Sequence, residues 1–216
     1  WTPVERYSSV PDTSADVALQ GIDGGLQITV GGQALKSGRL ALPGQHNLEN
    51  AAAAVLAACH AGVNPADAMQ ALQEFRGVKR RLEHLGTFDG MSVYDDYAHH
   101  PTAIQRTVDA LRATTTGRVL VVVEPRSNSM KLGAHREGLK ASLTDADRVW
   151  AYQPADLPWR LEDELADLAG ASVHADIADI VSEVAQFAQP GDDIVIMSNG
   201  GFGGIHKLIC DGLEYR

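Results

Sequence analysis

Residues 93–104 read Val93-Tyr94-Asp95-Asp96-Tyr97-Ala98-His99-His100-Pro101-Thr102-Ala103-Ile104, which predicts a strand end, a polar turn and a helix start. Met91 and Val93 alternate with other residues as in a half-buried strand. Pro101 suits the first turn of a helix, where its missing N–H costs nothing. From Ile104 onward, apolar residues recur at helical spacing. Turns at the carboxyl ends of strands usually bind ligands in α/β proteins, so we expect this turn to belong to a site.

The polar residues of this turn also have simpler interpretations. Asp95 and Asp96 could be ordinary turn residues, and His100 could cap the helix that follows it. Asp and His are both metal ligands, but neighbouring residues rarely converge on one ion without further ligands from elsewhere. We therefore expect no metal site formed by these residues alone.

Strands and helices alternate from about residue 84 to the end. A hairpin with Asp89-Gly90 at its turn comes first, and the apolar run 118–123 follows as a strand buried on both faces. The later segments predict helices at 131–143, 161–168, 177–188 and 205–213, and strands at 148–152, 172–174 and 193–197. This succession predicts a Rossmann-like α/β fold, with a mainly parallel sheet and helices on both of its faces.

The first part of the chain has a different pattern. Short strands are expected at 17–20, 26–30 and 39–42, forming a small antiparallel sheet. Two helices follow, one over the Ala-rich run 51–61 and one that starts at Asn64-Pro65 and buries Ala68, Met69, Leu72 and Phe75. We therefore expect two domains, an α+β segment over residues 1–84 and the Rossmann-like domain over residues 85–216.

Asn47 and Asn50 precede the Ala-rich run and lie three residues apart, so both can face the same side of the first helical turn. A carboxamide offers a donor and an acceptor together, which suits the edge of a nucleobase. The simpler interpretation is capping, with Asn47 at or near the N-cap. Similarly, the basic run Lys79-Arg80-Arg81 is either a solvated surface or a source of positive charge for a phosphate site.

Three polar turns follow predicted parallel strands, at 95–101, 124–131 and 198–206. Parallel strands share a carboxyl edge, so we expect the three turns to meet there. Arg126 and Lys131 can hold carboxylates. The glycine-rich third turn exposes backbone N–H groups near a helix start, which favours an anion. No stretch matches Gly-x-x-x-x-Gly-Lys-Ser/Thr, so we expect no Walker-type phosphate loop.

Composition and charge exclude several classes of protein. The 216 residues are 44% hydrophobic and carry a formal net charge of −10, which disfavours nonspecific binding to nucleic acid or to an anionic membrane. The two cysteines are far apart, and no secretory signal or long apolar stretch is visible. We therefore expect a soluble, cytoplasmic protein. Because the chain starts at Trp1 without Met, it could be a piece of a longer one.

Several stretches together resemble the Mur ligase family, the ATP-dependent amide-bond-forming enzymes of peptidoglycan metabolism. The resemblance covers nearly the whole chain, and its motifs occur in the family's order. The stretches that carry it are Gly44-Gln-His-Asn-Leu-Glu-Asn-Ala, Arg80-Arg-Leu-Glu, Asp95-Asp-Tyr-Ala-His-His-Pro, Glu124-Pro-Arg-Ser-Asn-Ser-Met-Lys and Ser198-Asn-Gly-Gly-Phe-Gly-Gly-Ile-His. The last two are most similar to those members that join UDP-N-acetylmuramate to the recycled tripeptide L-alanyl-γ-D-glutamyl-meso-diaminopimelate.

The resemblance implies that this chain is the tail of a central ATPase domain followed by the family's C-terminal domain. The UDP-binding domain and the phosphate-loop half of the ATPase domain would be missing. The implied cofactors are ATP and Mg²⁺, with most Mg²⁺ ligands in the missing part. The implied partners are UDP-N-acetylmuramate and the murein tripeptide, with no nucleic acid and no membrane. The implied role is peptidoglycan synthesis and recycling, and through it cell shape and division.

The resemblance also assigns roles to individual residues. Asn47 and Asn50 would contact adenine, and Asp96 would hold the ribose hydroxyls. Arg81 would face the ATP phosphates, and His99 would lie near them, which makes these two the implied catalytic residues. The candidates for holding the incoming tripeptide are Arg126, Ser127, Ser198 and Asn199.

Two other interpretations remain open. The nearest is another member of the family whose amine substrate is L-alanine instead of the tripeptide. The other is a non-catalytic Rossmann-like module that binds a nucleotide or a partner protein.

Overall fold

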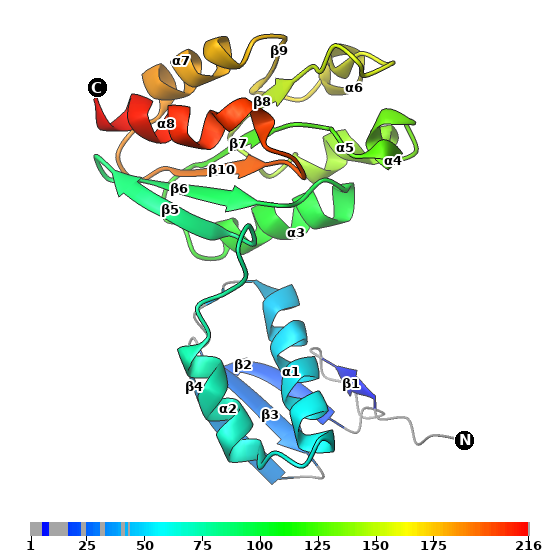
Figure 1. Cartoon of the computed structure of the whole chain (residues 1–216), viewed down its shortest axis with the longest axis vertical. Coiled ribbons are helices and arrows are strands. Elements are labelled where there is room, and N and C mark those ends of the chain that lie inside the picture. Colours follow the sequence, from blue (N-terminus) through cyan, green and yellow to red (C-terminus); the bar gives the residue numbers. More distant parts are fainter. Residues whose placement is uncertain are drawn as a thin grey trace. The chain divides into compact units, whose positions relative to one another are not determined.

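A computed structural model describes residues 6–8, 17–22, 25–30, 33–39, 42 and 44–215. The chain folds into two compact units, Trp1–Gly77 and Val78–Arg216 (Figure 1). The division after Gly77 lies upstream of the domain boundary expected after residue 84. The expected assignment of residues 1–84 and 85–216 to two named domains remains a prediction.

The first unit pairs a small sheet with two helices. Strands β2 (Val17–Ile22), β3 (Gly25–Val30) and β4 (Gln33–Arg39) are antiparallel, whereas β1 (Tyr7–Ser8) runs parallel to β2. The helices are α1 (Gln45–His60) and α2 (Pro65–Glu74). Their apolar faces form a core with the sheet, which includes Val17, Ile28, Ala52, Val55 and Met69.

Of three local expectations for this unit, the structure contradicts the burial of Phe75. The strand expected at 39–42 overlaps β4 at Arg39; Leu40 and Ala41 lie outside the described residues, and Leu42 is in a bend. Helix α1 begins at Gln45 with Gly44 as its N-cap, so Asn47 lies near the N-cap, in the first turn, but is not the capping residue. Phe75, expected in the core, is 41% exposed because it ends α2 in extended backbone.

The second unit is built on a six-stranded sheet. Its strand order is β5-β6-β10-β7-β8-β9; β5 is antiparallel to β6, and the other neighbours are parallel. The strands are β5 (Glu83–Phe88), β6 (Met91–Asp96), β7 (Val119–Val123), β8 (Arg148–Tyr152), β9 (Ala171–His174) and β10 (Asp193–Met197). The helices are α3 (Pro101–Arg112), α4 (Asn128–Lys131), α5 (Arg136–Ser142), α6 (Leu161–Leu165), α7 (Ile177–Phe187) and α8 (Ile205–Glu214), with a 3-10 turn at Phe202–Gly204.

Helices cover both faces of this sheet (Figure 1). On one face, α3, α5 and α6 pack against residues such as Val121 and Val195; on the other, α7 and α8 pack against residues such as Val122 and Ile196. Strand β7 is buried along its whole length, as expected for a strand covered on both sides. The predicted Rossmann-like, mainly parallel sheet with helices on both faces is confirmed.

The helix expected over 131–143 is divided in the structure. Helices α4 and α5 flank residues 132–135, and Gly133 has a φ of +74°, which interrupts a right-handed helix. The hairpin expected at Asp89-Gly90 is present: Phe88 pairs with Met91, and Asp89 and Gly90 have φ values of 45° and 80°. This is the left-handed geometry of a tight two-residue hairpin.

Cys59 and Cys210 are both free thiols and are partly exposed. Across the ranges described above, no helix is both long and apolar enough to cross a membrane. In the same ranges, no three His, Cys, Asp or Glu side chains are grouped so that they could hold a metal ion.

Candidate functional site

Three strand ends meet at one edge of the second unit's sheet. Strand β10 lies between β6 and β7, and the three run in the same direction. Beyond the strands, the Ser198 N–H donates to the Asp96 carbonyl at 3.1 Å, and the Glu124 N–H donates to the Met197 carbonyl at 3.0 Å. The turns after β6, β7 and β10 therefore begin side by side, as the sequence predicts.

The pleat of β6 sends its two terminal carboxylates to opposite faces of the sheet. Met91 and Val93 face the core under α7 and α8, and Asp95 continues that alternation toward His206 of α8. Asp96 lies on the other face, where Thr107 of α3 contacts it. Both carboxylates are buried, with 8% and 4% of their surface exposed, so neither is an ordinary turn residue.

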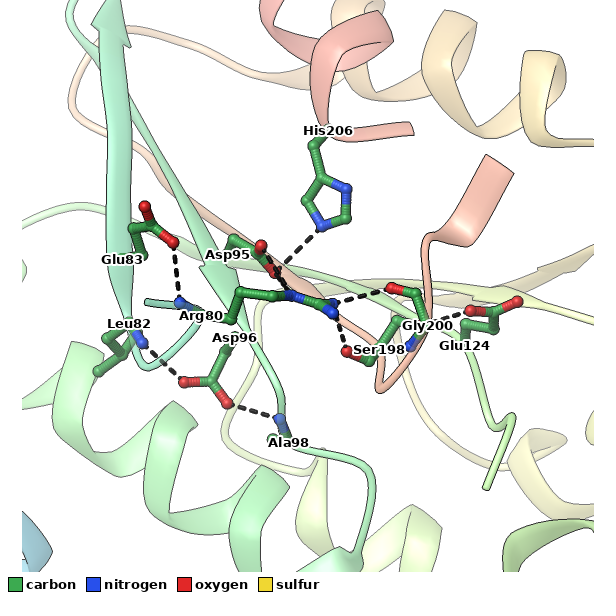
Figure 2. Close-up of polar contacts among 10 residues, drawn as sticks. All are labelled: Arg80, Leu82, Glu83, Asp95, Asp96, Ala98, Glu124, Ser198, Gly200 and His206. Carbon is green, nitrogen blue, oxygen red and sulfur yellow. Dashed lines mark hydrogen bonds and ion pairs between the residues drawn. The ribbon is translucent and has the colours of Figure 1, made fainter. Parts of the chain in front are cut away.

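Asp96 holds the start of the unit together through hydrogen bonds from its own chain. Its Oδ2 accepts from the Leu82 N–H at 2.8 Å, and its Oδ1 accepts from the Ala98 N–H at 2.7 Å (Figure 2). The Oδ1 atom also accepts from the Thr107 hydroxyl at 3.3 Å. Burial raises the pKa of Asp96, and the two amide hydrogen bonds counter this only in part. This carboxylate therefore links the backbone at Leu82 to the turn before α3 and to α3 itself.

Arg80 joins the turns after β6 and β10. Its Nε donates to Asp95 Oδ2 at 3.1 Å, and its Nη2 donates to the carbonyls of Ser198 at 2.7 Å and Gly200 at 2.9 Å (Figure 2). His206 Nε2 lies 3.1 Å from Asp95 Oδ1, so Asp95 bridges a guanidinium and an imidazole. We call Arg80, Asp95 and His206 the Arg80 network.

The Arg80 network also sets the ionisation of its carboxylate. Burial raises the pKa of Asp95, but the hydrogen bond and charge of His206, together with the charge of Arg80, outweigh it. The pKa of Asp95 is therefore held below its usual value, and the carboxylate remains charged down to acidic pH.

Arg80 and Arg81 are neighbours with different surroundings. Arg80 has a left-handed backbone with a φ of 59°, and its N–H donates to Glu83 Oε2 at 2.8 Å. Arg81 is exposed, and its guanidinium lies 5.6 Å from the centre of the Tyr97 ring. Arg80 is thus bound to its own fold, whereas Arg81 presents its charge at the surface.

The two histidines of this turn contact the local backbone. His100 is the N-cap of α3, and its Nδ1 accepts from the Thr102 N–H at 3.3 Å. Partial burial lowers the pKa of His100, and His135 and His99 lower it further, which favours the neutral ring that accepts this bond. His99 is partly exposed, and its Nδ1 lies 2.9 Å from the Tyr97 carbonyl. The capping interpretation of His100 is therefore confirmed.

The four expected tripeptide residues lie on the turns after β7 and β10. Ser127 caps α4, and its Oγ accepts from the Met130 N–H at 3.3 Å. Ser198 is fully buried; its Oγ donates to Glu124 Oε2 at 2.5 Å and accepts from the Gly200 N–H at 2.9 Å.

The other two expected tripeptide residues are Arg126 and Asn199, which carry polar groups without a hydrogen-bond partner among the described residues. Arg126 is exposed, and a Cβ added at Gly200 would lie 2.3 Å from Arg126 Nη1, so the guanidinium rests against that glycine. Asn199 Oδ1 is buried without a hydrogen-bond partner in the described part of the chain. The turns after β7 and β10 therefore carry a guanidinium, on Arg126, and an amide oxygen, on Asn199, that remain available to a ligand.

Asn47 and Asn50 belong to the first unit, in the first two turns of α1. Asn47 is partly exposed, and Asn50 is exposed. Their expected contact with adenine remains a prediction, as do the nucleotide roles of Arg81, Asp96 and His99.

The sequence does not predict Arg80, Glu124 or His206 as site residues, although each lies in one of the stretches that resemble the family. Arg80 is one of three successive basic residues, and nothing local distinguishes the one that turns inward. Glu124 follows a buried strand directly, and that position was the available signal for a buried carboxylate.

Residues 80–200 match a family described as Mur ligase, glutamate ligase domain. The UDP-N-acetylmuramate–L-alanyl-γ-D-glutamyl-meso-2,6-diaminoheptandioate ligase of Escherichia coli strain K12 is 45% identical over 194 residues, which cover 88% of this chain and 42% of that protein. The UDP-N-acetylmuramate–L-alanine ligase of Mycobacterium sp. strain JLS is 37% identical over 233 residues, which cover 99% of this chain and 47% of that protein.

Among solved structures, a murein peptide ligase from Psychrobacter arcticus 273-4 superposes with a TM-score of 0.73 at 36% identity. The match covers 100% of this chain and 48% of that one. The chain thus spans less than half the length of the curated relatives named above.

Proposed function

This chain belongs to the Mur ligase family, and from that membership we propose that it is the C-terminal portion of an ATP-dependent ligase of peptidoglycan recycling. The ligase joins UDP-N-acetylmuramate to L-alanyl-γ-D-glutamyl-meso-diaminopimelate in the cytoplasm. The observation that carries this proposal is the 45% identity to a relative with that printed activity, against 37% for the L-alanine ligase. The remaining domains would supply the UDP site and the phosphate loop.

The proposed reaction has two steps. A muramoyl carboxylate oxygen attacks the γ-phosphorus of ATP, and ADP leaves, so that an acyl phosphate forms. The amine of the tripeptide then attacks the acyl carbon, phosphate leaves, and the nitrogen loses a proton. Both steps bring anions together, so cationic and N–H groups must neutralise them.

Within this chain, the exposed guanidinium of Arg81 and the neighbouring His99 are the proposed contacts to the ATP phosphates. Asp96 is proposed for the ribose hydroxyls, and Asn47 and Asn50 for adenine. Asp96 already accepts three hydrogen bonds from its own chain, so a ribose would have to share its remaining lone pairs.

Asp95 and Asp96 do not suit Mg²⁺. Asp95 is bound by Arg80 and His206, and Asp96 by two amides and a hydroxyl. An ion there would have to displace these partners. We therefore propose that the Mg²⁺ ligands lie in other parts of the enzyme.

The acceptor specificity is tested by competition in the full-length enzyme. We expect ligation of UDP-N-acetylmuramate to the tripeptide when tripeptide and L-alanine are present at equal concentration, with products resolved by mass spectrometry. Preferential ligation of L-alanine would contradict the proposed substrate and support the L-alanine ligase instead. Nucleotide binding without ligation of either amine would support the non-catalytic module.

The isolated 216-residue chain is expected to release no phosphate from ATP, because most of the charge-neutralising groups would lie in the other domains. The measurement is a phosphate-release assay with both co-substrates and Mg²⁺, with the full-length enzyme as the positive control. Turnover by the isolated chain would show that it contains a complete site.

A further inference from the structure

His100 and His135 contact each other where two helices begin. Their ring centroids are 4.0 Å apart, and the ring planes are inclined at 63°. His100 is the N-cap of α3 and follows β6, whereas His135 is the N-cap of α5 and ends the segment 132–135. The contact therefore joins the turn after β6 to the segment that separates α4 from α5.

The backbone beside this contact is closely packed. A Cβ added at Gly138 of α5 would lie 3.2 Å from Cγ of Pro101, so the first turns of α3 and α5 lie against each other (Figure 1). The segment 132–135 is the less constrained partner, because Leu132 is 85% exposed. If the two imidazole rings repel each other, this segment is therefore the part that moves.

The hydrogen bond that His100 makes as a cap requires a neutral ring. Its Nδ1 accepts from the Thr102 N–H at 3.3 Å, which needs the lone pair on that nitrogen. Protonation removes this lone pair and so removes the cap. It also places a positive charge at the N-terminal end of α3, where the helix dipole opposes it.

The groups around His100 also oppose its protonation. Partial burial lowers the pKa of His100, and the charges of His135 and His99 lower it further. No carboxylate of the described residues is among the groups that shift this pKa, and the first turn of α3 carries no acidic residue. A proton on His100 is therefore not compensated from its own turn or helix.

The charged groups beside His135 belong to α5 and α6. Arg136 of α5 is paired with Glu164 of α6 at 3.5 Å, and Glu137 lies exposed in the first turn of α5. His135 itself makes no capping hydrogen bond with its side chain, so the fold does not fix its ring in that way. Two imidazolium rings at the present separation would repel each other.

We propose that His100 and His135 form an acid-sensitive latch, which holds the segment 132–135 against the start of α3 while the rings are neutral and releases it when they are protonated. Because folding lowers the pKa of His100, the latch is closed above the ordinary histidine pKa of about 6.5 and opens as the pH falls through the lowered value. In acid, the turn after β6 and the segment before α5 then lose this connection. The latch does not depend on which amine the ligase accepts.

Hydrogen exchange in the full-length enzyme tests the latch, measured between about pH 7.5 and 5.5 and corrected for the intrinsic exchange rate. The reporters at the two ends are the Thr102 N–H, which donates to His100, and the N–H groups of Gly133 and Ala134, which donate to the carbonyls of Met130 and Ser129. We expect the protection of both reporters to fall about tenfold in the wild type, the change that corresponds to one pKa unit.

Two variants separate the parts of the latch. His100→Asn keeps a good N-cap that does not titrate, so both reporters should stay within about twofold over the same range. His135→Phe keeps an aromatic ring but removes the second charge. Gly133 and Ala134 should then stay protected, whereas Thr102 should lose protection at a higher pH than in the wild type. The control is His60→Gln, an exposed residue in the last turn of α1, which should keep the wild-type pH dependence.

Two results would overturn this inference. One is wild-type protection of both reporters that does not change between neutral and acidic pH. The other is a His100→Asn variant that keeps the wild-type pH dependence, because the titrating group would then lie elsewhere. Either result leaves the proposed function standing, which the competition between tripeptide and L-alanine tests separately.

Discussion

Asp96→Ala is expected to lower the free energy of unfolding of the second unit by about 2–5 kcal/mol. The substitution leaves the Leu82 and Ala98 amides, which now donate at 2.8 and 2.7 Å, without acceptors in a buried position. Each unsatisfied buried donor costs about 1–3 kcal/mol. Relief of the burial cost that raises the pKa of Asp96 offsets part of this loss.

Urea unfolding followed by tryptophan fluorescence measures this change, because Trp150 is fully buried in the second unit. Hydrogen exchange adds a local readout, since the Leu82 and Ala98 amides should lose protection first. The matched control is Asp109→Ala on the exposed face of α3, where the expected change is within about 0.5 kcal/mol. Equal urea midpoints for the two variants would contradict the proposal that the hydrogen bonds of Asp96 stabilise the second unit.

Replacing Arg80 or Arg81 with alanine is expected to give opposite results, although the two residues are adjacent. Arg80→Ala removes the ion pair to Asp95 and two hydrogen bonds to the carbonyls of Ser198 and Gly200. It should lower the free energy of unfolding by about 2–4 kcal/mol, because charged hydrogen bonds contribute about 1.5–3 kcal/mol each and His206 still partners Asp95. Arg81→Ala should change it by less than about 0.5 kcal/mol.

For ATP binding, we expect the larger effect from the substitution of Arg81 and not from that of Arg80. If Arg81 faces the ATP phosphates as proposed, Arg81→Ala should raise the KM for ATP in the full-length enzyme about 10-fold or more without destabilising it. Arg80→Lys is the informative companion, because an ammonium cannot reproduce the planar fork that reaches Asp95 and two carbonyls together. A destabilised Arg81→Ala, or an Arg80→Ala as stable as wild type, would contradict this division of roles.

Much of the fold could be predicted because the signals are local. A few neighbouring residues specify each of three elements: Pro101 and its preceding cap specify α3, Asp89-Gly90 specifies the β5–β6 hairpin, and a continuous apolar run specifies β7. The predictions that were wrong depend on contacts elsewhere. Phe75 is exposed because it ends α2 in extended backbone, and Gly133 interrupts a segment whose periodicity predicts one helix.

The candidate site was predicted at the level of turns but not of side chains. The rule that parallel strands share a carboxyl edge placed the turns after β6, β7 and β10 together. It could not tell that Asp95 and Asp96 face opposite sides with different partners, because the outcome depends on which helix covers each face. Nor could it show that Glu124 is buried with no cationic partner among the described residues.

The sequence by itself determined the order of strands and helices, the parallel sheet and the edge where the polar turns gather. These features follow from periodicity and turn chemistry, which operate over a few residues. Only the tertiary structure decided which polar groups are hydrogen-bonded within the fold and which remain available to a ligand. The backbone is left-handed at Arg80 and Leu82, and it turns Arg80 inward and leaves Arg81 exposed. Ser198, which is remote in sequence, donates a hydrogen bond to one carboxylate oxygen of Glu124 and not to the other. Such pairings join residues far apart along the chain, so no local pattern encodes them.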